Sequence, residues 1–407
     1  MFGPYRAVLG RPGALAFSLA GLVARLPISM VGIGIVLAVQ GIYDSYALAG
    51  RVSAVYIVVS SVTAPMIGRL VDKYGQARVM APTTVVAALG LVALIVVLML
   101  EAPEAALYAA AVVAGVTGQF GSLVRARWSY VLRRDGGALH TAYSLESAFD
   151  EVVFIVGPAT ATILATSVAP TAGIVVPLIA MAIGATWFLS QRATEPPVVA
   201  HGGPHGGPVW RSGGMIVLII VFLAMGAIFG ATDVATVAFA DEAGRKPLAG
   251  VLLAVCALGS MVSGLLYGAR HWVRPLWVRF VVGMVGLAVG ISLLVLVGEL
   301  WELAIVLFVT GFAIAPTLIN GNGLVQELVP ASRLTEGLTW VGTALGVGVS
   351  IGSSVSGARV EAAGAKAGYV VVVVAAGAAV VATLAAVRTL RAGHQARLAA
   401  EAVASPE

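Results

Sequence analysis

Twelve apolar segments of about 20 residues each dominate this 407-residue chain. Each is long enough to cross a hydrocarbon layer of about 30 Å as a helix. These runs are too long and too evenly apolar for barrel strands, and helices satisfy backbone polar groups within the segment. The chain is only 11% charged, whereas a soluble domain is about 25% charged. We therefore predict an all-α integral membrane protein with 12 transmembrane helices, which begin near Ala14, Tyr46, Val79, Ala105, Thr141, Thr171, Met215, Leu248, Leu276, Leu303, Leu334 and Ala367.

The basic residues are distributed unevenly between the loops that these segments leave. Of the 24 Lys and Arg residues, Arg25 lies within a helix, and only Arg51, Arg245, Lys246, Arg359 and Lys366 fall in loops on the side away from the N-terminus. Loops rich in Lys and Arg remain cytoplasmic, so this distribution predicts a multi-pass protein of the cell membrane with both termini in the cytoplasm. The formal net charge of +5 therefore reflects topology rather than nucleic-acid binding.

One long connection lies between the sixth and seventh segments. It is rich in Pro and Gly, a composition that behaves as a flexible tether. We therefore predict an N-terminal six-helix bundle at 1–190, a cytoplasmic linker at 191–213, and a C-terminal six-helix bundle with a short cytoplasmic tail at 214–407. The linker residues His201 and His205 are four apart, as in a metal-binding pair. No helix is predicted to align them and no acidic or Cys partner lies nearby, so we interpret both as solvated linker residues.

The sequence GRLVDKYGQARV, residues 68–79, gathers charge at the connection between the second and third segments. Its charged residues are Arg69, Asp72, Lys73 and Arg78. Its glycines, Gly68 and Gly75, allow a tight turn and a close approach of helices. The sequence GLLYGARHW, residues 264–272, repeats the spacing in the second half, with Gly268 where an acid would stand.

This motif resembles the loop between helices two and three of the major facilitator superfamily, whose pattern is G-x-L-x-D-[RK]-x-G followed by basic residues. Gln76 and Ala77 depart from the usual basic pair, while Arg78 keeps one positive charge. The resemblance implies two six-helix bundles, related by a pseudo-twofold repeat, that rock about a central site. It also implies that the charged cluster is a latch between the bundles. The alternative is a positive-inside anchor that includes an acid.

Five acidic residues fall within the predicted helices, namely Glu146, Asp150, Glu151, Asp233 and Glu336. Ionised carboxylates deep in a membrane are costly and mark ion or substrate pathways. Only Arg25 lies with them as a base, so some of these acids must be protonated, wet, or closer to an interface than predicted. Glu146 and Glu336 lie near the predicted starts of their helices, where both would be wet. Asp150 and Glu151 are the deepest.

The deep acids suggest a proton carrier, because burial and a neighbouring like charge favour the protonated form of a carboxylate. We predict that Asp150 or Glu151 binds and releases the coupling proton, with Arg25 as the counter-charge. Glu146 lies one turn before Asp150 on the same helix face and is a further candidate. The alternative is a buried Arg25–Asp150 pair that only holds helices one and five together.

Two other elements bear on coupling. Gly157 and Pro158 predict a kink in the fifth helix. Antiporters of the family carry a longer Gly-x-x-x-Gly-Pro-x-x-Gly-Gly run there, of which this chain keeps only the Gly-Pro, so an antiporter element and a structural kink both remain open. Arg125 resembles the arginine of helix four in proton-linked members and is a candidate coupling residue. Arg127 lies nearer the interface and is predicted to snorkel towards water.

The family fold implies that helices one, four, seven and ten line the substrate cavity. Besides Arg25, the candidate cavity residues are Gln40, Gln119, Phe120, Phe229, Asp233, Asn320, Asn322 and Gln326. Few of them are charged, which favours a largely apolar organic compound over a sugar.

We therefore predict a proton-coupled secondary active transporter that works by alternating access and exports a small, largely apolar organic compound or drug by proton antiport. The alternatives are a metabolite uptake symporter or facilitator and, from another class, a non-transporting membrane receptor or enzyme. The water-facing segments hold no nucleophile–base grouping, metal-ligand cluster or nucleotide loop, so we expect no enzymatic activity, no metal and no cofactor. We expect a monomer whose partners are its substrate, protons and the lipid bilayer.

Overall fold

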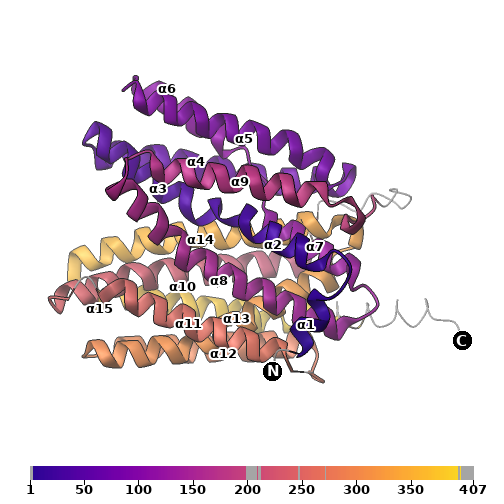
Figure 1. The fold of residues 1–407 in the computed structure, drawn as a ribbon. Coiled ribbons are helices and arrows are strands. Elements are labelled where there is room, and N and C mark those ends of the chain that lie inside the picture. The colour runs from indigo at the N-terminus through magenta and orange to yellow at the C-terminus, as the bar shows by residue number, and fades with distance from the viewer. Residues whose placement is uncertain are drawn as a thin grey trace, which may run out of the picture. The chain divides into compact units, whose positions relative to one another are not determined.

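The computed structural model of this protein describes residues 3–198, 209, 212–245, 248–270, 272–392 and 395 (Figure 1). This part of the chain is built of helices and contains no strand. Within it, twelve segments are helical, long and apolar enough to cross a membrane. The predicted all-α membrane fold is therefore confirmed. His201 and His205 of the predicted linker lie outside the described residues.

In the first half of the chain, the described residues form nine α-helices and a short 3-10 helix. These are α1 Gly3–Leu9, α2 Ala14–Arg25, α3 Pro27–Tyr43, α4 Tyr46–Tyr74, α5 Gln76–Met99, α6 Glu104–Gly115, α7 Phe120–Val131, α8 Gly136–Ser167, α9 Ala172–Ser190 and η1 Arg192–Thr194. The second half of the described chain contains α10 Gly213–Glu242, α11 Leu248–Gly268, α12 Leu276–Ser292, η3 Leu293–Val295, α13 Leu300–Leu328, η4 Ala331–Arg333, α14 Leu334–Ala363 and α15 Ala365–Ala385.

The chain divides into two compact units. The N-terminal unit contains Arg6–Leu139 and Phe149–Ala200. The C-terminal unit contains His201–Glu407 together with Met1–Tyr5 and His140–Ala148. The first residues of α1 and the early part of α8 therefore belong to the same unit as the helices of the second half.

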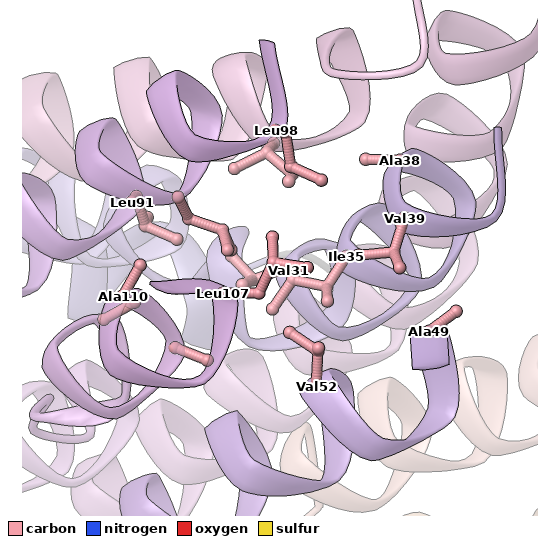
Figure 2. Close-up of a cluster of buried hydrophobic side chains, with 14 of the residues drawn as sticks. Val31, Ile35, Ala38, Val39, Ala49, Val52, Leu91, Leu98, Leu107 and Ala110 are labelled. Atoms are coloured by element: carbon pink, nitrogen blue, oxygen red, sulfur yellow. The ribbon is translucent and has the colours of Figure 1, made fainter. Parts of the chain in front are cut away.

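An apolar core holds the N-terminal unit together. Side chains of α3, α4, α5 and α6 meet in one buried cluster, in which Figure 2 shows Val31 and Ile35 of α3 near Leu91, Leu98 and Leu107. Gly90 of α5 faces the backbone of α6 at Ala114, where an added Cβ would collide. Small residues thus bring α5 and α6 into close contact. Such contact matters in a membrane, because helices there associate through van der Waals packing and not through the hydrophobic effect.

The C-terminal unit uses the same device on a larger scale. Helix α10 packs along α14 and α15, and α11 packs along α13 (Figure 1). Gly226 and Gly230 of α10 face the backbone of α14, and Gly348 and Gly352 of α14 face the backbone of α10. Ser356 Oγ adds a hydrogen bond of 3.1 Å to the carbonyl oxygen of Ala231. Backbone-to-backbone packing therefore joins these two helices.

In the N-terminal unit two of the spans are interrupted, and neither interruption is among the predictions made from the sequence. The span Ala14–Tyr43 changes from α2 to α3 at Leu26, where Pro27 occupies the first position of α3. The span Glu104–Val131 is broken between Gly115 and Phe120, where four residues are not helical. Broken membrane helices expose backbone groups and mark binding or coupling sites in many transporters. Both interruptions lie in the N-terminal unit.

Within the C-terminal unit, side chains from α1 and α8 cap the last carbonyl groups of α11. Tyr5 Oη donates to the carbonyl oxygen of Leu265 at 2.5 Å, His140 Nε2 to that of Tyr267 at 3.2 Å, and Thr141 Oγ1 to that of Gly268 at 2.7 Å. Burial raises the pKa of Tyr5, which keeps its hydroxyl protonated as a donor. A Cβ at Gly268 would collide with Ser144 and Tyr5. This explains why the second copy of the motif has no acid there.

Candidate functional site

Asp150 of α8 is shared between two arginines in the N-terminal unit. Arg25 Nη1 donates to Asp150 Oδ1 at 2.8 Å, and Arg125 Nη2 donates to Asp150 Oδ2 at 2.6 Å. One carboxylate thus joins α2, α7 and α8, with each of its oxygen atoms bound to a different guanidinium group. Hydrogen bonds between ionised groups are about twice as strong as those between neutral groups.

The three side chains differ in their access to solvent. The side chain of Arg25 is 3% exposed and that of Arg125 is 10% exposed, whereas that of Asp150 is 31% exposed. The acid is therefore the open member of the cluster, and the bases lie behind it. A charged group in a membrane-spanning segment is costly unless it is paired or reaches a water-filled cavity. Among the three side chains, the paired carboxylate is the one with the largest exposed fraction.

Local features of α2 and α7 place the two arginines. Arg25 lies in the last turn of α2, where the helix dipole favours a cation, and its Nε donates to the carbonyl oxygen of Gly21 at 3.1 Å. Arg125 lies one turn after Gly121 on α7. A Cβ on Gly121 would lie 3.3 Å from Arg125 Nη1 and 3.4 Å from the Cδ of Arg25. Gly121, which the sequence analysis did not identify, therefore leaves room for both guanidinium groups.

Helix α8 is longer than predicted, which changes the depth of Asp150. The helix begins at Gly136, where Asp135 accepts a hydrogen bond from the backbone N–H of Ala138. Asp150 thus lies about 21 Å along the helix, at 1.5 Å per residue. Pro158 lies inside the assigned helix. Gly157 faces Ser29 of α3, whose Oγ donates to the carbonyl oxygen of Val153 at 2.9 Å. Gly157 therefore also serves close packing.

The prediction that Glu146 and Glu336 are exposed to water is wrong, because both side chains are buried. Glu336, in the first turn of α14, forms an ion pair at 2.7 Å with Arg333, the N-cap residue of that helix. Glu151 is half-buried, and Asp233 is exposed on α10. The burial of these acids is therefore set by packing against neighbouring helices and not by their depth along their own helix.

The predicted cavity residues occupy different environments. Asn320 is fully buried and donates to Tyr267 Oη at 2.9 Å, and Phe120 is buried with its ring against Phe188. Asn322 donates to the carbonyl oxygen of Leu318 in its own helix. The remaining candidates are half-buried, namely Gln40, Gln119, Phe229 and Gln326. Gln119 is the N-cap residue of α7 and lies at the interruption of the fourth span.

In the charged motif, Gly75 alone makes the turn between α4 and α5. Its φ is 95°, whereas Gly68 is a buried residue inside α4. Asp72 is half-buried in the last turn of α4, and Arg69, Lys73 and Arg78 are exposed. The turn is held from the segment after α9, because Glu195 Oε1 accepts a hydrogen bond of 2.9 Å from the backbone N–H of Ala77.

Arg127 does not snorkel as predicted, because it is fully buried. Its Nε donates to Gln76 Oε1 at 2.8 Å, and its Nη1 donates to the carbonyl oxygen of Gln191 and to Thr194 Oγ1 at 2.9 and 3.0 Å. Its guanidinium carbon lies 3.9 Å from the centroid of the Phe188 ring. Arg127 therefore ties the turn after α4 to α7 and to the segment that follows α9.

The conformation of Gly75 gives a prediction for stability. At φ 95° and ψ 152° the backbone lies in a region open almost only to glycine, and a Cβ would lie 3.2 Å from Glu195 Oε1. Gly75→Ala should lower the free energy of unfolding by about 1–3 kcal/mol, seen as a lower midpoint of thermal unfolding in detergent. Gly50→Ala, inside α4 with open space around it, is the control and should be neutral or stabilising. Equal effects of the two substitutions would contradict this account of the turn.

Comparison with known proteins decides the family. The sequence model of the Major Facilitator Superfamily matches residues 17–281, which is well over half of the chain. The chain belongs to this family. No curated protein matches it. Membership makes the chain a multi-pass membrane transporter rather than an enzyme.

Solved structures share the fold at low sequence identity. A bacterial homologue of the iron transporter ferroportin, in an outward-facing state, has a TM-score of 0.72 and 14% identity, over 91% of this chain and 98% of that one. The human organic anion transporter MFSD10 (TETRAN) has a TM-score of 0.65 and 15% identity, over 94% and 99%. These likenesses confirm the two-bundle fold of the superfamily. No group of three metal-ligating side chains occurs among the described residues.

Proposed function

We propose that this protein is a proton-coupled transporter of the cell membrane that exports a small, largely apolar organic compound or drug by proton antiport. The observation that carries the proposal is the shared carboxylate of Asp150, bound by Arg25 at 2.8 Å and by Arg125 at 2.6 Å. Alternating access would use bundles at 1–190 and 214–407, joined by the linker 191–213. Both termini would be cytoplasmic, and the protein would act as a monomer.

The charge of Asp150 gives a physical route from proton binding to helix movement. In its ionised form the carboxylate draws Arg25 of α2 and Arg125 of α7 towards α8. A proton on Asp150 would cancel this attraction and leave two nearly buried guanidinium groups close together. Two like charges 4 Å apart repel by about 4 kcal/mol at an effective dielectric constant of 20. Protonation would therefore favour a different arrangement of α2 and α7, each of which adjoins an interruption of its span.

The side-chain types of the predicted cavity residues support the substrate class. Those that are half-buried carry amides and one aromatic ring, and Asp233 is an exposed acid on α10. Such surroundings suit a compound with a large apolar surface and few polar groups. One structural relative is a bacterial homologue of an iron transporter and the other is an organic anion transporter, so the shared fold by itself does not select a substrate.

Transport by the purified protein in liposomes tests the proposal. A growth-inhibition panel on cells with and without the protein first selects a compound, and the liposomes then receive an imposed pH gradient. We expect the compound to accumulate on the acidic side, because protons moving down their gradient drive the antiported compound the other way. Accumulation on the alkaline side would indicate symport, and flux independent of the gradient would indicate a facilitator. Either of these, or the absence of flux, would contradict the proposal.

A further inference from the structure

The connection between α11 and α12, taken together with the first turn of α12, carries three arginines and no acid. Arg270 and Arg274 are exposed in the connection, and Arg279 lies in the first turn of α12. The sequence contains no Asp or Glu from Ala243 to Gly298. None of the three arginines forms an ion pair with any residue in the described part of the chain. Their positive charge is therefore not balanced by the described residues of the protein.

Arg279 is held in place although its hydrogen-bonding capacity is hardly used. Its Nη1 donates a long bond of 3.4 Å to Tyr267 Oη, and its Nε is buried without a hydrogen-bond partner among the described residues. Its guanidinium carbon lies 6.0 Å from the ring centroid of Tyr267 and 5.9 Å from that of Trp272. Tyr267 is fixed in turn by Asn320. A guanidinium group has five N–H donors. On Arg279 one Nη1 donor is used by Tyr267 and the Nε–H is buried, which leaves the other Nη donors for a ligand.

The position of this cluster indicates what the ligand is. The connection joins the spans Leu248–Gly268 and Leu276–Leu296, so it lies where the chain leaves and re-enters the membrane. Trp272 and Val273 are exposed there, and Trp272 Nε1 donates to the carbonyl oxygen of Tyr267 at 2.9 Å. Exposed Trp residues at span ends are typical of the lipid headgroup region. A soluble protein partner would not need this placement.

We propose that Arg270, Arg274, Arg279 and Trp272 bind the phosphodiester headgroup of an anionic phospholipid. The planar fork of an arginine matches two phosphate oxygens, and three arginines offer more positive charge than one phosphodiester can neutralise. Arg279 supplies the inner, pre-positioned contact. Arg270 and Arg274 supply the outer ones, and Trp272 and Val273 lie against the apolar part of the lipid. This binding does not depend on proton coupling or on the exported compound.

Titration of the purified full-length chain in detergent tests the site. Phosphatidylglycerol or phosphatidylcholine is added, and binding is measured by native mass spectrometry and by the midpoint of thermal unfolding. We expect phosphatidylglycerol to bind and to raise the midpoint, while phosphatidylcholine does neither. Each of Arg270→Gln, Arg274→Gln and Arg279→Gln should weaken phosphatidylglycerol binding about fivefold, as expected for one basic residue near an anionic headgroup. Equal responses to the two lipids would overturn the proposal.

Three controls separate a built site from general attraction. The double variant Arg133→Gln and Arg134→Gln removes two exposed charges after α7 and should bind phosphatidylglycerol as the wild type does. Arg279→Lys keeps the charge but not the fork, and it should also weaken binding if Arg279 is the inner contact. Inorganic phosphate at the same concentration should not raise the midpoint. Equal loss in the double variant, or equal stabilisation by inorganic phosphate, would refute a specific lipid site.

Discussion

Replacing Asp150 with Asn should reduce transport driven by a pH gradient to the level of empty liposomes. Asparagine keeps the shape of the side chain and one acceptor oxygen, but it has no charge and no titratable proton. Arg25 and Arg125 then remain nearly buried beside a neutral group. Removing one partner of a buried pair costs about 3–5 kcal/mol, so the midpoint of thermal unfolding in detergent should also fall. Transport is measured as compound accumulated per folded protein in liposomes.

A second substitution separates coupling from simple stabilisation. In the double variant Arg125→Gln and Asp150→Asn, one arginine is removed together with the acid, so the net charge of the three-residue cluster returns to its original value. The stability should then recover much of its loss, while pH-driven transport should stay absent. If transport also recovers, Asp150 only holds the helices together. That outcome would support the structural alternative for the Arg25–Asp150 pair.

Glu151 provides the comparison within the same helix. It points about 100° away from Asp150 around α8 and is half-buried. Glu151→Gln should leave pH-driven transport close to that of the wild type if Asp150 carries the proton. Loss of coupling in Glu151→Gln with coupling retained in Asp150→Asn would assign the proton to Glu151. Unchanged coupling in both variants would show that neither Asp150 nor Glu151 carries the coupling proton.

The sequence was sufficient to predict the number of spans, because lipid imposes a minimum apolar length that few other structures satisfy. It was less informative about the continuity of those spans. Pro27 at the start of α3 is a visible signal for the first interruption, since a proline favours the first position of a helix. The second interruption, from Val116 to Gln119, follows Gly115 in an otherwise apolar run. An interior break of this kind depends on which neighbouring groups form hydrogen bonds with the freed backbone N–H and C=O groups, and the sequence alone does not identify those neighbours.

The candidate site contains contacts that the sequence predicts and others that it does not. Charge inventory alone brought Arg25 and Asp150 together as candidates, because few charges lie within the spans. It left open whether Arg125 joins them, since that depends on which face of α7 meets α8. For Glu336 a local signal existed, because Arg333 precedes it by three residues, a spacing that places the two side chains together on a helix. The position of Glu336 near the helix start predicts exposure, but packing against neighbouring helices buries its side chain.

The prediction that Arg127 snorkels is wrong for the same reason. This residue follows Arg125 by two residues, which turns it by about 200° around α7 and aims it at a different set of neighbours. The departure of Gln76 from the family's basic pair now has an explanation. Gln76 is buried, its amide oxygen accepts from Arg127, and its Nε2 donates to the carbonyl oxygen of Leu123 at 3.1 Å. A basic residue at this position would face a buried arginine.

We expect Arg127→Met to lower the free energy of unfolding by about 3 kcal/mol. The substitution preserves much of the volume but removes the donors to Gln76, Gln191 and Thr194. Each buried acceptor left without a donor costs about 1–3 kcal/mol, and water at the segment after α9 will satisfy some of them. The midpoint of thermal unfolding in detergent measures the effect. Arg133→Met, at an exposed arginine two residues after the end of the same helix, should change stability by no more than about 0.5 kcal/mol.

Exchanging the two partners tests whether the pair itself is responsible. Gln76→Arg alone places a second guanidinium group against Arg127 and should be destabilising. The double variant Gln76→Arg and Arg127→Gln restores one arginine and one amide in the opposite order, so it should be more stable than either single variant. A double-mutant cycle gives the coupling free energy between the two positions. A Gln76→Arg variant as stable as the wild type would contradict a closely packed pair.

Substitutions on the two faces of α7 should therefore have different effects, one on stability and the other on coupling. Arg127→Met removes contacts that tie the α4–α5 turn to α7, but it leaves Arg125 and Asp150 bonded. Its pH-driven transport per folded protein should remain close to that of the wild type, although less protein survives heating. The double variant of Arg125 and Asp150 should show the reverse, with stability largely kept and coupling lost. If Arg127→Met instead lost coupling while remaining folded, the turn and the shared carboxylate would act as one unit, and the assignment of coupling to Asp150 alone would be wrong.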